Sequence, residues 1–92
     1  MAQNIRHDHA RFYIENESGH TIAELTYVLT ENDAMDITHT FVDPSLRGQG
    51  TARQLLDAAA QFARDTNRSI IPTCPYIEAQ FNKDESLHDL RA

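Results

Sequence analysis

The sequence has a single cysteine, no tryptophan, and only three glycines and three prolines in 92 residues. One cysteine excludes an internal disulfide, which favours a reducing compartment and predicts a cytoplasmic protein. No apolar run approaches the roughly 20 residues of a membrane-spanning helix, and Met1–Ala10 lacks the apolar core of a signal peptide, so we expect no membrane association. Basic residues are also scarce, with 8 lysines and arginines against 14 acidic residues and a net charge of −6. Because nucleic-acid-binding proteins normally carry a basic face, we expect no nucleic-acid partner.

What is present is typical of a globular protein, since 40% of the residues are hydrophobic and charges of both signs are mixed among them. A chain of this length suffices for one modest core, so we predict a single domain over residues 1–92. Residues 1–9 are predicted to be a frayed terminus or the approach to an edge strand. His7 and His9 flank Asp8 there, which is a possible metal-binding pattern, but no other ligand cluster supports it and we expect no metal.

Alternating apolar and polar residues predict strands over Arg11–Glu17, Thr21–Leu29 and Met35–Val42, joined by polar turns. In the third strand, simple alternation places two sets of side chains on opposite faces. One face is expected to carry Met35, Ile37, His39 and Phe41, and the other Asp36, Thr38, Thr40 and Val42.

The clearest predicted helix is Gly50–Asp65, whose apolar residues recur at steps of three and four. These residues are Ala52, Leu55, Leu56, Ala59, Phe62 and Ala63. A short strand over Ser69–Thr73 and a short helix that begins at Pro75 follow. A strand, a crossover helix and a second strand should place the two strands parallel. The sequence therefore predicts an α/β (α+β) fold with a mixed, mostly antiparallel sheet, one long crossover helix and a short C-terminal helix.

The turn before the long helix reads R-G-Q-G-T-A and has the chemistry of an anion site. Its glycines let the backbone turn closely, and the amides and the helix N-terminus carry partial positive charge. The predicted donors are the amides of Arg47, Gly48, Gln49, Gly50, Thr51 and Ala52, with full charges from the side chains of Arg47 and Arg53. Neither a Walker A loop nor a dinucleotide-binding loop matches, because the required lysine and glycine spacings are missing. The alternative is a loop that only connects the strand to the helix.

R-G-Q-G-T-A fits the R/Q-x-x-G-x-G/A signature of GNAT (GCN5-related) N-acetyltransferases, and residues 10–85, with T-H-T-F-V, A-R-Q-L-L and P-T-C-P-Y, resemble small single-domain members of that family. The resemblance implies a reduced GNAT fold in which the strands Met35–Val42 and Ser69–Thr73 splay apart. It implies an acyltransferase that uses acetyl-CoA as co-substrate and an amine as acceptor. The pyrophosphate would bind the Arg47–Ala52 turn, and the pantetheine arm would lie beside Thr40, Phe41 and Val42.

The chain lacks the N-terminal helices and most of the C-terminal hairpin that usually build the acceptor site in this family. A CoA-binding or acyl-CoA-binding module with little or no transferase activity is therefore the alternative. A homodimer in which the second subunit completes the site is also open, as is a monomer.

Three residues are candidates for catalysis. Cys74 precedes a helix N-terminus, which lowers a thiol pKa, so it could attack a thioester, donate a proton or line the acyl pocket; alternatively it is a small buried hydrophobe. Tyr76 lies near the tyrosine that protonates the CoA thiolate in many GNAT enzymes, and its alternative is a packing aromatic. His39 could be the general base or a core histidine. Glu24 and Glu78 are further base candidates, or ordinary surface charges.

Overall fold

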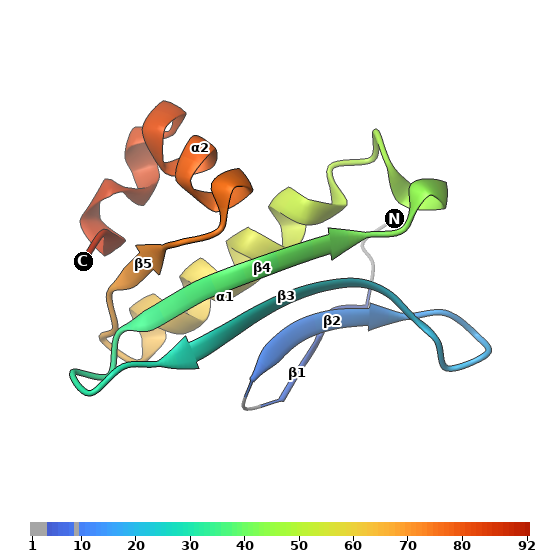
Figure 1. The fold of residues 1–92 in the computed structure, drawn as a ribbon, viewed down its shortest axis with the longest axis horizontal. Coiled ribbons are helices and arrows are strands. Elements are labelled where there is room, and N and C mark those ends of the chain that lie inside the picture. The colour runs from blue at the N-terminus through green and yellow to red at the C-terminus, as the bar shows by residue number, and fades with distance from the viewer. Residues whose placement is uncertain (1–3, 9) are drawn as a thin grey trace.

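A computed structural model describes residues 4–8 and 10–92 of the chain (Figure 1). The elements in order are β1 (Arg6–His7), β2 (Arg11–Glu15), β3 (Thr21–Leu29), β4 (Met35–Val42), the 3₁₀ turn η1 (Pro44–Leu46), α1 (Thr51–Asp65), β5 (Ile70–Pro72), α2 (Pro75–Lys83) and the 3₁₀ segment η2 (Glu85–Leu90). The predicted bounds of β3 and β4 are confirmed. The prediction for β2 was two residues too long, because Asn16 leaves the strand and its side chain accepts the amides of Ser18 and His20 in the following turn.

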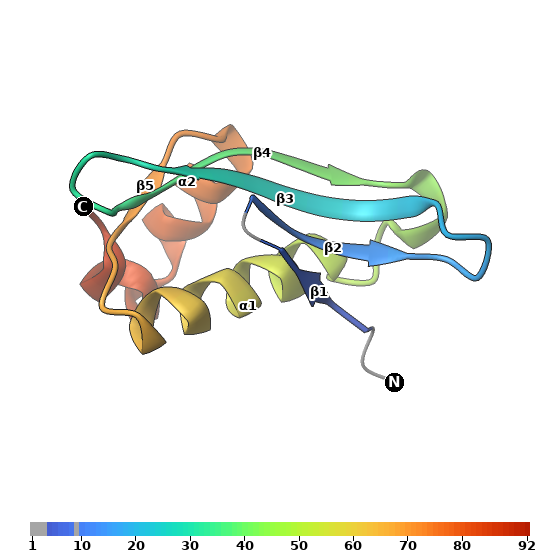
Figure 2. The same ribbon diagram turned by 90° about the horizontal axis from the view of Figure 1, so that it is seen from below.

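The strands form one sheet in the order β1-β2-β3-β4-β5, antiparallel throughout except for the parallel pair β4 and β5. Figure 2 shows α1 against one face of this sheet, while α2 lies beside β5 at its edge, so no described helix covers the opposite face of β2, β3 and β4. The predicted α/β class with a mixed, mostly antiparallel sheet is confirmed. No helix among residues 4–8 and 10–92 is long and apolar enough to cross a membrane.

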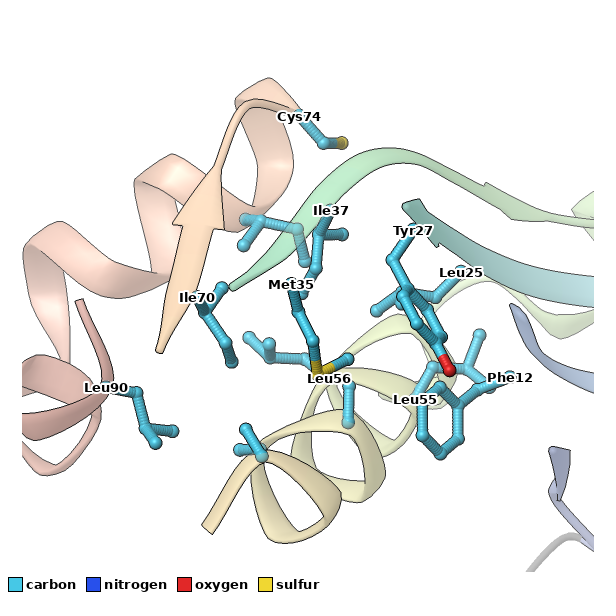
Figure 3. Packing of buried hydrophobic residues seen from close by; sticks show 14 of the residues in the cluster. Phe12, Leu25, Tyr27, Met35, Ile37, Leu55, Leu56, Ile70, Cys74 and Leu90 are labelled. Atoms are coloured by element: carbon cyan, nitrogen blue, oxygen red, sulfur yellow. The ribbon is translucent and has the colours of Figure 1, made fainter. Parts of the chain in front are cut away.

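The core lies between the sheet and α1, and the helix contributes the predicted stripe of small and branched residues. Of the predicted stripe, Leu55, Leu56, Ala59 and Ala63 are buried, whereas Ala52 and Phe62 are half-buried; Ala60, which was not predicted, is buried as well. The close-up in Figure 3 shows Met35 and Ile37 of β4 and Ile70 of β5 pointing toward this helix. The alanines allow α1 to approach the sheet closely, and α2 and η2 extend the same core through Ile77, Phe81, Leu87 and Leu90.

A β-bulge in β4 changes which side chains face the helix. Thr26 pairs with His39 and Tyr27 with Ile37, so Thr38 is an extra residue on β4. After the bulge the alternation is reversed, since Thr40 pairs with the fully buried Leu25 and Phe41 pairs with Glu24. The prediction that His39 and Phe41 share a face with Met35 and Ile37 was therefore wrong. Both lie on the uncovered face and are exposed.

The N-terminal segment forms an edge strand, because Arg6 and His7 pair with Tyr13 and Phe12 of β2. The His7 ring stacks on Phe12 with centroids 3.9 Å apart, and its Nε2 shares a 2.6 Å hydrogen bond with the Tyr27 hydroxyl. His9, the other histidine of the considered metal pattern, lies outside the described residues. In the part of the chain that is described, no group of three or more His, Cys, Asp or Glu side chains is placed to hold a metal ion.

We expect His7 to make folding stability depend on pH. Packing against the rings of Phe12 and Phe62 desolvates His7 in part, although the residue remains exposed, and this lowers its pKa below the ordinary 6.5 against an opposing effect of Asp8. The unfolded chain therefore binds more protons than the folded chain below about pH 6.5, so the stabilisation is complete above that pH and is lost as pH falls. In urea unfolding, wild type should lose more of its free energy of unfolding than His7→Phe when the pH falls from 7.5 to 5.5. The exposed His20→Gln is the control, and a pH-independent difference would contradict the assignment.

Candidate functional site

The two parallel strands at the centre of the site separate after a short pairing. β4 pairs with β5 only from Met35 to Ile37, and the chain then turns so that the amide of Cys74 donates to the carbonyl of Ile37 at 2.9 Å. No described strand covers the β5-facing edge of β4 beyond this point. By the alternation of strand hydrogen bonds, the backbone groups of Thr40 and Val42 point to this open edge. Pairing by one more extended chain is therefore possible there.

The chain reaches α1 through a turn that leaves several donors unused. Gly48 and Gly50 have φ values of 83° and 73°, in the left-handed region that glycine adopts without strain. Gly50 is the N-cap of α1 and supplies no side-chain cap. Of the six predicted donors, the amides of Arg47 and Gln49 are not free, because they donate to the carbonyls of Pro44 and Leu46. Within residues 4–8 and 10–92, no acceptor takes up the amides of Gly48, Gly50, Thr51, Ala52 and Arg53. Free amides at the N-terminus of a 15-residue helix favour an anionic ligand.

The two arginines of the turn have different environments. Arg47 is exposed and has no ion-pair partner among the described residues, whereas every other arginine in the chain makes an ion pair. Arg53 binds Asp57 at 2.8 Å, the Gln80 side-chain oxygen at 3.0 Å, and Asp84. Arg53 therefore links α1 to α2 and η2, while Arg47 is the arginine available to a ligand.

A cavity of about 240 Å³ lies against this turn and ends at α2. Its lining consists of Val42, Leu46, Arg47, Gly48, Gly50, Thr51, Ala52, Arg53 and Tyr76. Thr51 is 2% exposed, and its hydroxyl is buried without a hydrogen-bond partner in the described structure. A buried hydroxyl that lacks a partner is costly, which is expected where a ligand supplies the acceptor.

A larger cavity of about 400 Å³ opens near the other end of α1, beside Arg64, Arg68 and Asp89. Arg64 is paired there with Asp89, and Arg68 with Asp33. Both guanidinium groups have carboxylate partners, although the buried Arg68 Nε has no hydrogen-bond partner in the described structure. Unlike the glycine turn, this cavity has no run of free backbone amides among its lining residues. The cavity at the glycine turn is chemically the better candidate for an anionic ligand.

The start of α2 closes the splay between β4 and β5. Cys74 is buried at the N-cap of α2, and its sulfur lies 3.5 Å from the hydroxyl of Thr40. Burial raises the pKa of the Cys74 thiol, but hydrogen bonds from the Thr40 hydroxyl and from the amides of Ile77, Tyr76 and Thr40 outweigh it, so the pKa falls below its ordinary value. For Tyr76, burial raises the pKa above 10, despite the opposing charge of Arg53.

Comparison with known proteins accounts for this combination of an open strand edge, a glycine turn and a helix N-terminus. The family model described as GCN5-related N-acetyl-transferase matches residues 11–90. The chain belongs to the GNAT family.

Relatives agree with this membership. The chain is 32% identical to "Protein NATD1" of Xenopus tropicalis over 76 residues, which is 80% of this chain and 70% of the relative. It is also 32% identical to "Protein NATD1" of Bos taurus over 85 residues, covering 90% and 74% of the two chains. The solution structure of a GCN5-like protein from Staphylococcus aureus matches with a TM-score of 0.81 and 32% identity, over 97% of this chain and 87% of that one. Membership in the family makes the protein an acyltransferase whose general chemistry is acetyl transfer.

In this GNAT protein the three base candidates have different surroundings. His39 is exposed on the uncovered face, so the alternative of a core histidine was wrong. Glu24 lies on the same face, and its carboxylate accepts the Arg11 guanidinium at 2.9 Å. Glu78 of α2 pairs with Arg91 at 3.4 Å. His39 is the candidate base that has no ion-pair partner among the described residues.

Two features of the site were not predicted from the sequence. Leu46 lines the cavity from η1, and the only sequence signal was an apolar residue in an otherwise polar turn. The buried hydroxyl of Thr51 was missed because its isolation depends on how the N-terminus of α1 packs, and a threonine at a helix start is unremarkable in sequence.

Proposed function

We propose that this chain binds acetyl-CoA at the glycine turn and transfers the acetyl group to an amine. The observation that carries the proposal is the nest of free amides beside the unpaired Arg47 and the buried, partnerless Thr51 hydroxyl. A diphosphate is an acceptor-rich anion that satisfies all three kinds of donor. This local cluster of donors would also allow a protein with a net charge of −6 to bind a polyanion, because the attraction acts over a short distance.

The other parts of the ligand fit the adjoining surfaces. The open edge of β4 at Thr40 and Val42 would bind the pantetheine amides as a neighbouring strand does, with Phe41 directed to the opposite face. Val42, Leu46 and Tyr76 supply the apolar wall of the cavity. Acetyl-CoA contributes an acetyl group activated as a thioester. The splay at Cys74 would receive that end of the molecule.

The proposed transfer forms a bond between the amine nitrogen and the acetyl carbon and breaks the carbon–sulfur bond. His39 takes one proton from the amine, because an exposed histidine without an ion-pair partner in the described chain can act as a general base. Tyr76 returns one proton to the departing sulfur, and its raised pKa keeps the hydroxyl protonated at neutral pH. Cys74, with its lowered pKa, is poorly suited to donate a proton and fits the acyl pocket as a lining group or a nucleophile.

A CoA-binding module with little or no transferase activity is the second candidate, and the uncovered sheet face favours it, because no described helix encloses an acceptor there. CoA release measured over a panel of polyamines, amino acids and peptides separates the two. Turnover on any amine supports the transferase. Binding of acetyl-CoA without turnover on the whole panel supports the module.

Thr51→Val tests the phosphate site, because it should raise stability and lower CoA affinity. The substitution keeps the shape of the side chain and removes a buried hydroxyl that lacks a partner, so the free energy of unfolding should rise by about 1 kcal/mol. CoA affinity should fall roughly tenfold, because a hydrogen bond to an anion is lost. Urea unfolding and calorimetric titration measure the two effects.

Thr66→Val is the matched control at the other end of α1. The Thr66 hydroxyl donates to the carbonyl of Phe62 at 2.7 Å, so its removal should lower stability and leave CoA affinity unchanged. A Thr51→Val protein that binds CoA as tightly as wild type would contradict the proposed phosphate site.

A further inference from the structure

The bulge of β4 turns one hydroxyl group toward the end of the candidate site. Strict alternation from the buried Ile37 would place Thr40 on the face away from the helices. Because Thr38 is an extra residue, Thr40 instead pairs with the fully buried Leu25 and points to the helix side of the sheet. Its hydroxyl lies 3.5 Å from the sulfur of Cys74. Bulges beside active sites commonly redirect a side chain in this way.

The sulfur of Cys74 is surrounded by hydrogen-bond donors although the residue is buried. Burial raises the pKa of the Cys74 thiol, and among the hydrogen bonds that lower it the largest contribution comes from the Thr40 hydroxyl. The remaining donors are backbone amides at the start of α2 and in β4, so the Thr40 hydroxyl is the donor that a substitution can remove. Because a thiolate accepts hydrogen bonds and donates none, this arrangement favours the charged form of the sulfur.

Cys74 also lies at one end of the open edge of β4. Its amide donates to the carbonyl of Ile37, which is the last residue of β4 that pairs with β5. At the other end, β4 finishes at Val42 and the chain continues into the glycine turn. An extended ligand along this edge therefore has the glycine turn at one end and the Cys74 sulfur at the other. The proposed function puts the thioester at the Cys74 end.

We propose that Thr40 is a positioning residue for acetyl transfer, whose hydroxyl holds the Cys74 sulfur as a thiolate that attacks the thioester. The inference rests on the proposed function and assigns Cys74 the nucleophilic role. A carbon–sulfur bond to Cys74 forms, the carbon–sulfur bond to CoA breaks, and the departing CoA sulfur takes the proton of Tyr76. The amine then attacks the acetyl group on Cys74 and gives its proton to His39, and Cys74 leaves as a thiolate that Thr40 again stabilises. Solvent water returns a proton from His39 to Tyr76.

The test is the pH dependence of alkylation by iodoacetamide in wild type, Thr40→Val and Thr40→Ser. Cys74 is the sole cysteine, so the adduct measured by mass spectrometry reports this thiol alone. Valine keeps the shape of the side chain and removes the donor. The midpoint of the pH profile should therefore move to higher pH, and the rate at pH 7 should fall about tenfold. Serine keeps the hydroxyl and should restore the wild-type profile.

A merely structural role of Thr40 predicts a change of opposite sign. If Thr40→Val only loosened the packing of α2, the thiol would become more accessible and would react faster at every pH. Thr26→Val is the matched control, because Thr26 pairs with the exposed His39 and its hydroxyl lies on the uncovered face. This control should leave the alkylation profile unchanged. An unchanged or faster reaction of Thr40→Val would overturn the inference.

Acetyl-CoA supplied without an amine separates failure of this inference from failure of the proposed function. Wild type should gain a single acetyl group on Cys74, and Thr40→Val should gain it about tenfold more slowly while its CoA affinity stays within about twofold of wild type. CoA binding without any acetyl adduct would overturn the inference and leave direct transfer to the amine standing. Absence of CoA binding by wild type would overturn the proposed function, and a shifted alkylation profile would still support the hold of Thr40 on the thiol.

Discussion

Replacement of Arg47 by glutamate is expected to weaken CoA binding roughly 30-fold, which corresponds to about 2 kcal/mol. The reason is that Arg47 is the arginine of the turn without an ion-pair partner in the described chain, so its guanidinium is free to contact a diphosphate even though its charge also acts on nearby Asp43. The variant replaces attraction by repulsion at the edge of the amide nest. Calorimetric titration with CoA at low and moderate salt measures the effect.

Salt and a matched charge reversal provide the controls. The loss should shrink as ionic strength rises, because Arg47 is exposed and its interaction is screened over about 10 Å at 0.1 M salt. Lys83→Glu makes the same change in net charge at the C-terminal end of α2, outside the cavity lining, and should leave CoA affinity nearly unchanged. Equal losses in the two variants would mean that net charge, and not the turn, controls binding.

The architecture was predictable because each element has a regular pattern of its own. Thr21–Leu29 alternates and Thr51–Asp65 repeats at helical spacing, and a helix between two strands leads to a parallel pair. The faces of β4 were not predictable, because the bulge at Thr38 depends on how β3 pairs with it. One extra residue reversed the orientation of His39 and Phe41 and moved the candidate base from the core to an open surface.

The same distinction applies to the site, where some features depend on neighbouring residues in sequence and others on distant ones. The free amides of Gly48, Gly50, Thr51 and Ala52 could be predicted, since the glycines and the helix start are contiguous in sequence, whereas the amides of Arg47 and Gln49 close local turns. The contacts of Arg53 with Gln80 and Asp84 could not be predicted, because these partners lie 27 and 31 residues away in sequence. From the sequence, Arg47 and Arg53 were both expected to supply charge to the turn, whereas the tertiary contacts make Arg53 a structural cross-link and leave Arg47 without an ion-pair partner in the described chain.

The position of α2 matters for the site, because this helix and its N-cap carry Tyr76 and Cys74. We expect Phe81→Ala to lower the free energy of unfolding by about 3–5 kcal/mol, since Phe81 is fully buried and its truncation leaves a cavity. A chain of this length has about 5–14 kcal/mol of stability in total, so the variant should be near its unfolding threshold. Arg91 lies 5.4 Å from the centre of the ring, so the attachment of η2 should weaken as well.

Urea unfolding followed by far-ultraviolet circular dichroism measures this loss, and Phe41→Ala is the matched control. Phe41 is 40% exposed on the uncovered face, so its truncation should cost no more than about 1 kcal/mol. Without urea, where Phe81→Ala remains folded, the thiol of Cys74 should react faster with an alkylating reagent, because looser packing of α2 exposes a residue that is only 6% accessible in the native state. Equal stability of the two variants, or an unchanged alkylation rate, would mean that the contacts of Arg53 with Gln80 and Asp84 hold α2 without the buried ring.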